Sequence, residues 1–187
     1  MRITQPAIPS QSSSRQRGVT AVESMMVLAI IGILAGVTMP DAEPVRQRAE
    51  LIGLASQVET DVHLSRSEAV ARNRTVHFTL QQAAGGGACY QVHLGSTPAC
   101  TCDDLLAQRC NDNGLVRSQA LPANSRVTVL GNVRTMSFDP LKGTVTPTGT
   151  LRVVARDGQA LHQVIGLLGR VRTCSPGGGS ALGAPAC

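Results

Sequence analysis

An apolar stretch near the N-terminus constrains the fold of this chain more than any other feature. From Val19 to Met39 the sequence runs for 21 residues with one charged side chain, Glu23. As an α-helix this stretch is roughly 31 Å long, which is enough to cross the hydrocarbon core of a bilayer. Arginines and no acidic residues occur within residues 1–18. The sequence therefore predicts a cytoplasmic N-terminus, with the residues beyond 41 outside the cytoplasm.

Glu23 needs a partner, because an isolated carboxylate in an apolar helix costs roughly 2.5–3.5 kcal/mol on insertion scales. Two simple interpretations of the stretch provide none. A secretory signal peptide would be cut after the apolar run, but no good small-residue cleavage site precedes Pro40. A plain transmembrane anchor also leaves the carboxylate unexplained.

The residues around Glu23 resemble the type IV prepilin signature. Residues 17–23 read RGVTAVE and lead into the aliphatic run, with Val19 where the family usually has Phe. The resemblance implies that a membrane prepilin peptidase cuts between Gly18 and Val19 and that Val19 is then N-methylated. In that family the Glu pairs with the N-terminal amine of a neighbouring subunit during assembly. Such a pair would neutralise both charges in an apolar environment, which explains Glu23.

A second helix is predicted after Pro40 and Pro44, which interrupt the first one. We expect it from about residue 45 to 72, stopped near Asn73, with one face covering a sheet. The apolar positions that recur at helical intervals are Leu51, Leu54, Ala55, Val58, Val62 and Ala69. The polar positions between them are filled by Arg46, Arg48, Glu50, Glu59, Asp61 and Arg66.

From Thr75 onwards the pattern is that of β-strands. Gly85-Gly86-Gly87 and Asp157-Gly158 predict turns, the second of them a hairpin. The expected strands are residues 75–80, 89–94, 126–130, 134–138, 151–156 and 160–168. The order of one long helix followed by antiparallel strands predicts an α+β fold with the sheet packed on the helix.

These elements divide the chain into four expected parts. Residues 1–18 form a prepilin leader and residues 19–40 a transmembrane assembly helix. Residues 41–174 form a pilin globular domain, and residues 175–187 form a Pro/Gly-rich tail.

Six cysteines in an exported chain favour disulfides over a metal site. They are Cys89, Cys100, Cys102, Cys110, Cys174 and Cys187. Cys100-Thr101-Cys102 is not the CxxC of zinc sites, so no metal is expected. Cys174 with Cys187 would close the tail into a loop, but the sequence does not determine the pairing of the six.

Two further stretches resemble the GspH/FimT family of type IV pilin-like proteins. Residues 64–76 look like the end of that family's long helix, and Gly169-Arg170-Val171-Arg172 resembles the Gly-Arg-x-Arg end of FimT-type minor pilins. Some members bind double-stranded DNA through this basic region during DNA uptake. Residues 105–187 hold nine Lys or Arg against three Asp. Solvated arginines on an edge strand are the alternative interpretation of Arg170 and Arg172.

Arg170 and Arg172 lie two apart, and we expect both on a last strand that follows the six given above. Both should then project from one face and reach phosphates. Arg134, Arg152 and Arg156 are further candidates, although nothing in the sequence puts them on that face.

No motif of a catalytic site or cofactor occurs, so neither an enzyme nor a cofactor is expected. Two functions are predicted instead. The first is a FimT-like minor type IV pilin that helps pilus assembly and captures DNA. The alternative is a GspH-like minor pseudopilin of a type II secretion system. Expected partners are the prepilin peptidase, other pilins or pseudopilins, the inner membrane, which the chain would cross once, and double-stranded DNA.

Overall fold

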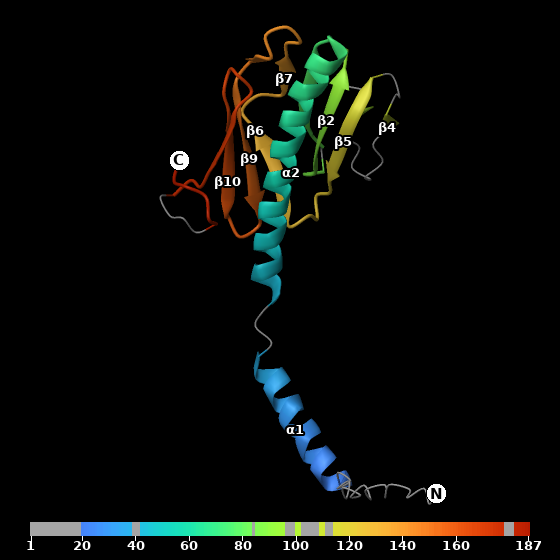
Figure 1. The fold of residues 1–187 in the computed structure, drawn as a ribbon, viewed down its shortest axis with the longest axis vertical. Helices are drawn as coiled ribbons and strands as arrows, with labels where there is room; N and C mark the ends of the chain where they lie inside the picture. Colours follow the sequence, from blue (N-terminus) through green and yellow to red (C-terminus); the bar gives the residue numbers. More distant parts are fainter. Residues whose placement is uncertain are drawn as a thin grey trace, which may run out of the picture. The chain divides into compact units, whose positions relative to one another are not determined.

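The computed structural model describes residues 20–38, 42–83, 85–95, 100–101, 109–110, 114–177 and 182–187. The chain divides into two compact units, Met1–Ala42 and Glu43–Cys187. Figure 1 shows the ribbon of both units. Each unit is described by itself.

The first unit contains the helix α1 (Ala21–Thr38), where the apolar run predicted a helix. Thr20 caps it, because its Oγ1 accepts a hydrogen bond from the backbone N–H of Glu23 at 3.3 Å. The described side chains of α1 are all exposed. Among the helices of the described residues, none meets the length and apolarity required of a membrane span.

The second unit begins at Glu43, the second residue of the helix α2 (Ala42–Arg72). The helix starts before the predicted residue 45 because Pro44 is tolerated in a first turn, where no N–H is needed. It ends as predicted. Asn73 adopts a left-handed φ of 49°, and Arg74 N donates to Ala69 O at 3.2 Å, which is the Schellman arrangement.

One face of α2 is buried and contains every apolar position that the sequence predicted for it. These are Leu51, Leu54, Ala55, Val58, Val62 and Ala69. The prediction that Asp61 is a polar surface position is wrong, because Asp61 is only 2% exposed. Its carboxylate accepts hydrogen bonds from Tyr90 Oη at 2.7 Å and from Arg117 Nε at 2.9 Å, which compensates for its burial.

The strands of the second unit form two larger antiparallel sheets. The five-stranded sheet has the order β5-β2-β1-β7-β8, and the four-stranded sheet has the order β11-β10-β9-β6. The first contains β1 (Val76–Gln82), β2 (Ala88–Leu94), β5 (Leu115–Leu121), β7 (Thr135–Phe138) and β8 (Val145–Thr146). The second contains β6 (Val127–Gly131), β9 (Gly149–Ala155), β10 (Ala160–Ile165) and β11 (Val171–Cys174).

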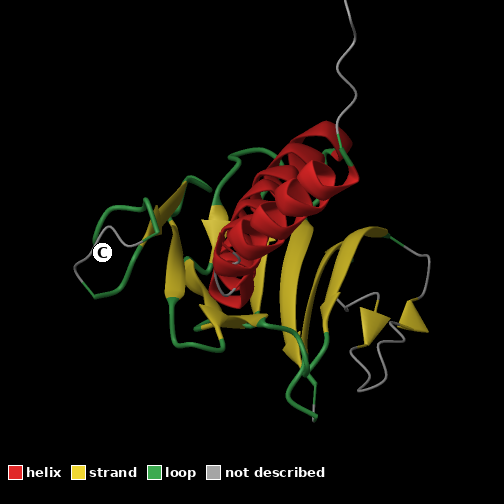
Figure 2. Cartoon of the chain, turned by 90° about the horizontal axis from the view of Figure 1, so that it is seen from below, coloured by secondary structure: helices red, strands yellow, loops and turns green. Residues whose placement is uncertain are grey.

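Figures 1 and 2 show α2 packed on one side of the strands. The buried face of α2 and the inward side chains of both sheets make one aliphatic core, in which Phe78 stacks on Tyr90 with ring centroids 5.1 Å apart. The core residues that the structure describes all lie between Leu51 and Leu182, within the second unit.

The α+β class and the six expected strands are confirmed, with shifted ends. The turns are also present, since Gly86 and Gly158 have φ of 89° and 87°. The prediction missed β5 and β8. It also missed a short ladder of β3 (Cys100–Thr101) and β4 (Arg109–Cys110), which lies between β2 and β5 in the sequence.

The expected strand over residues 160–168 is too long. β10 ends at Ile165 because the chain turns there: Gly166 N donates to Arg170 O at 2.9 Å, and Gly169 N donates to Gly166 O at 2.9 Å.

Candidate functional site

The turn Gly166–Arg170 joins β10 to β11 and carries part of the expected DNA-binding motif. Gly169 is buried there with a left-handed φ of 71°. A Cβ on Gly169 would lie 3.2 Å from Arg66 Cδ and 3.5 Å from Val145 Cγ2. Both the backbone conformation and the close approach therefore favour glycine at this position.

Arg170 and Arg172 are both exposed, and neither guanidinium has a hydrogen bond or ion pair with the residues that the structure describes. The prediction that both lie on a strand is wrong for Arg170. β11 begins at Val171, so Arg170 belongs to the preceding turn. Arg172 lies on β11 opposite Val164 of β10, on the face of the sheet turned away from α2.

Arg66 of α2 is a neighbour that sequence reasoning did not assign to the site. Its side chain reaches the turn at Gly169 and also approaches Gly143, where a Cβ would lie 3.1 Å from Arg66 Nε. The only sequence signal for Arg66 was its position within residues 64–76, the stretch that resembles the end of the family's long helix. The fold thus brings an arginine of the helix next to the Gly-Arg motif, about a hundred residues later in the chain.

Of the three further candidates, Arg152 shares the outer face of the four-stranded sheet. It lies opposite His162 of β10. His162 is two residues from Val164, the partner of Arg172, so the two side chains point to the same face of the sheet. The pKa of His162 is lowered below its usual value. The main cause is partial burial, and the positive charge of Arg152 adds to it.

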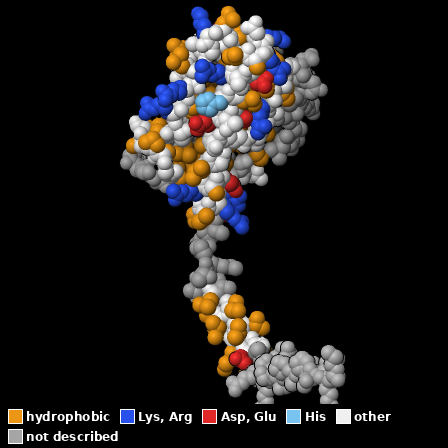
Figure 3. Space-filling view, in the orientation of Figure 1, with side chains coloured by type: hydrophobic (Ala, Val, Ile, Leu, Met, Phe, Trp, Pro, Cys, Tyr) orange, Lys and Arg blue, Asp and Glu red, His pale blue; other side chains and the backbone are white. Residues whose placement is uncertain are grey.

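Arg134 and Arg156 do not join this face. Arg134 precedes β7 of the other sheet, and Arg156 lies in the β9–β10 turn, where its Nε donates to Ser125 O at 3.1 Å. Figure 3 shows Lys and Arg side chains at several places on the face of residues 43–187 that it presents.

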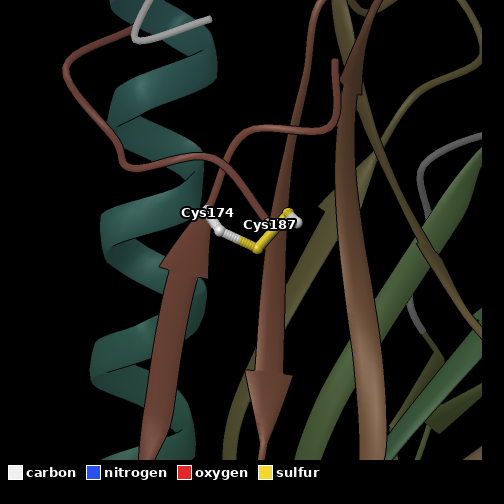
Figure 4. Close-up of a disulfide and its surroundings, with 2 residues drawn as sticks. All are labelled: Cys174 and Cys187. Carbon is white, nitrogen blue, oxygen red and sulfur yellow. A yellow bond between two sulfur atoms is a disulfide. The ribbon is translucent and has the colours of Figure 1, made fainter. Parts of the chain in front are cut away.

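The end of β11 is joined to the C-terminus by a disulfide between Cys174 and Cys187, with an S–S distance of 2.09 Å (Figure 4). Next to it, Ser175 N donates to Pro185 O at 2.8 Å and Cys187 N donates to Ser175 O at 3.1 Å. Leu182 is part of the core. The described part of the tail is therefore packed against the domain.

The other disulfide candidates are only partly described. Cys89 of β2 is buried and disulfide-bonded. Cys102 lies outside the described residues. Cys100 and Cys110 are directly opposite each other in the β3–β4 ladder, where the structure describes only their backbone.

The expected processing site, Gly18 and Val19, lies outside the described residues. Glu23 is in the first turn of α1, where a carboxylate also interacts favourably with the positive end of the helix dipole. In the part of the chain that is described, no group of three or more His, Cys, Asp or Glu gathers as metal ligands would.

A pair of histidines lies on the five-stranded sheet. His77 of β1 and His93 of β2 are directly opposite and stack with ring centroids 5.4 Å apart. Burial lowers the pKa of both imidazoles, and the neighbouring His77 lowers that of His93 further. His93 is fully buried, with Thr79 Oγ1 3.0 Å from its Nε2.

Comparisons with known proteins find similarity to pilin-like proteins. The profile of the family described as "Type II transport protein GspH" matches residues 54–169. The "Pilin-like protein PilA1" of Thermus thermophilus is 28% identical over 158 residues, which cover 84% of this chain and 97% of that protein. The crystal structure of the type IV minor pilin FimU of Pseudomonas aeruginosa aligns with a TM-score of 0.46 and 21% identity, covering 74% of this chain and 98% of FimU.

Proposed function

The chain belongs to the GspH family of pilin-like proteins, and we propose that it is a FimT-like minor type IV pilin that captures double-stranded DNA. As a pilin-like subunit it associates with other pilins or pseudopilins. The proposed DNA-binding residues are Gly169, Arg170 and Arg172, with Arg66 and Arg152 beside them.

Maturation of the proposed pilin begins at the N-terminus. A prepilin peptidase cuts between Gly18 and Val19, and Val19 is N-methylated. The retained helix holds the subunit in the inner membrane, with the second unit on the periplasmic or extracellular side, until assembly. Glu23 then pairs with the Val19 amine of a neighbouring subunit. The support is the prepilin-like sequence at residues 17–23 and the helix that follows it.

The observation that carries the DNA proposal is the exposure of two arginines, Arg170 and Arg172, beside a tight glycine turn. Arginine suits phosphate because its planar guanidinium donates two parallel hydrogen bonds. Arg66 approaches the same turn from α2. Contacts of this kind bind the backbone of DNA without reading bases, so binding should be independent of sequence and weakened by salt.

The test is a titration of residues 43–187 against plasmid DNA at several salt concentrations. Replacing Arg170→Gln together with Arg172→Gln should weaken binding and reduce the slope of log affinity against log salt by about 2. The matched control is Arg46→Gln with Arg48→Gln, which removes the same charge from exposed positions near the start of α2.

Two outcomes would contradict the proposal. One is that residues 43–187 do not bind DNA at low salt. The other is that the control weakens binding as much as the Arg170 and Arg172 replacements do. Either would favour the alternative function, a GspH-like minor pseudopilin of a type II secretion system.

A further inference from the structure

Three large leucine side chains are exposed on two turns of the second unit. Leu141, in the turn between β7 and β8, is 84% exposed, and Leu167 and Leu168, in the turn between β10 and β11, are 57% and 65% exposed. Single exposed apolar side chains are common, but a group of them on one surface marks an interaction site.

The two turns are neighbours, although about 25 residues separate them in sequence. Val145 N, just after the first turn, donates to Leu167 O of the second at 2.8 Å. Gly143 and Gly169, one in each turn, both approach the side chain of Arg66. We call the surface formed by Leu141, Leu167 and Leu168 with Arg66, Lys142 and Arg170 the tip surface.

The charge of the tip surface is positive. Arg66, Lys142 and Arg170 are exposed. The carboxylate within the two turns is that of Asp139, and its Oδ1 accepts the backbone N–H groups of Leu141 at 2.9 Å and Lys142 at 2.7 Å. The carboxylate of Asp139 therefore stabilises the turn that contains it. Neither turn, as the structure describes it, provides an acidic partner for the three cations.

We propose that the tip surface binds an anionic lipid bilayer. The leucines would enter the boundary between headgroups and acyl chains, and the cations would lie at the level of the anionic headgroups. The long side chains of Lys and Arg suit that level because their aliphatic stems can be buried while their charges stay hydrated.

A DNA duplex fits the tip surface less well than a bilayer does. Phosphates would satisfy the cations, but a duplex held by its backbone leaves three leucines in water. A bilayer removes the leucines from water and neutralises the cations at the same time. The inference goes beyond the proposed DNA binding. The tip surface shares Arg66 and Arg170 with the proposed DNA site, but the inference does not depend on DNA binding, because the leucines that carry it play no part there.

The test uses residues 43–187, a compact unit that contains every described core residue and lacks α1, an apolar helix that would bind lipid by itself. The fragment is mixed with vesicles of phosphatidylcholine alone or with added phosphatidylglycerol, and binding is measured by flotation. We expect binding to the anionic vesicles only. Leu167→Ser with Leu168→Ser should weaken it at least about tenfold without changing the charge.

The matched control is Val45→Ser, which removes an apolar side chain that is 64% exposed at the start of α2. It should leave vesicle binding unchanged. A thermal melt of each variant checks that it is folded.

Three results would overturn the proposal. The leucine variant could bind anionic vesicles as tightly as the wild type. The wild-type fragment could bind phosphatidylcholine vesicles equally well. In a parallel titration with duplex DNA, the leucine variant could lose DNA affinity by the same factor as lipid affinity, which would make the leucines part of a nucleic-acid interface.

Discussion

Asp61 is a charged residue on the buried face of α2, tied to both Tyr90 and Arg117. Replacing Asp61 leaves the hydroxyl of the buried Tyr90 without this hydrogen bond, which is costly, whereas the exposed Arg117 guanidinium can be hydrated. We predict that Asp61→Ala lowers the free energy of unfolding of residues 43–187 by about 1.5–3 kcal/mol, because the lost hydrogen bond is to a charged group. Tyr90→Phe should cost about 1–2 kcal/mol, since it removes a single hydrogen bond. Urea denaturation measures both, and equal small losses would contradict the account.

Gly169 gives a second prediction at the scale of single residues. Gly169→Ala should destabilise residues 43–187, because alanine at a left-handed φ costs about 1–2 kcal/mol and its Cβ would also crowd Arg66. Gly158→Ala is the matched control, since Gly158 also has a positive φ but has open space around its Cβ position. Urea denaturation should show the larger loss for Gly169→Ala. Equal losses would mean that the contact with Arg66 has no energetic effect.

At the scale of elements, the pairing of β1 with β2 buries His77 against His93. Burial lowers the pKa of both, so the unfolded chain binds protons at a higher pH than the folded chain. Their stabilising contribution is fully present above the ordinary histidine pKa of about 6.5. It is lost as the pH falls from there through the folded-state pKa values.

The prediction is that the free energy of unfolding of residues 43–187 decreases between pH 7 and pH 5. His77→Gln with His93→Gln should make that dependence shallower, whereas His63→Gln, at an exposed position of α2, should not. Chemical denaturation at each pH measures the effect. An unchanged pH dependence in the double variant would show that other groups cause it.

Elements with a clear periodicity could be predicted from the sequence. The spacing of Leu51, Leu54 and Val58 predicted both α2 and its buried face, because a helix in contact with a sheet must repeat its apolar positions every three or four residues. β5 was missed since residues 115–121 are mostly half-buried and mix polar with apolar side chains without alternation. β8 has two residues and shows no pattern.

The candidate site was predictable only in part, and the reason is physical. Gly169, Arg170 and Arg172 are neighbours in sequence, so a motif could identify them. The approach of Arg66 depends on how α2 packs against the turns, and the shared face of Arg152 and Arg172 depends on strand register. Contacts between distant segments leave no local periodicity to read. The burial of Asp61 was missed for the same reason, because its partners come from β2 and β5.

At the scale of the whole molecule, an apolar N-terminal helix precedes a domain with its own core. The central claim is that the chain is a pilin-like subunit whose first helix is retained and used for assembly. That claim depends on where the chain is cut. A prepilin peptidase leaves the apolar run on the mature protein, whereas a signal peptidase removes it.

The most direct test is the N-terminus of the mature protein, determined by mass spectrometry of the chain purified from membranes of a host that has a prepilin peptidase. The account predicts that the mature chain begins at Val19, with a methylated amine, and retains Glu23. A Gly18→Ala variant should remain uncut if the expected cleavage site is correct. A mature N-terminus near residue 40, or an uncut wild-type chain, would contradict the claim.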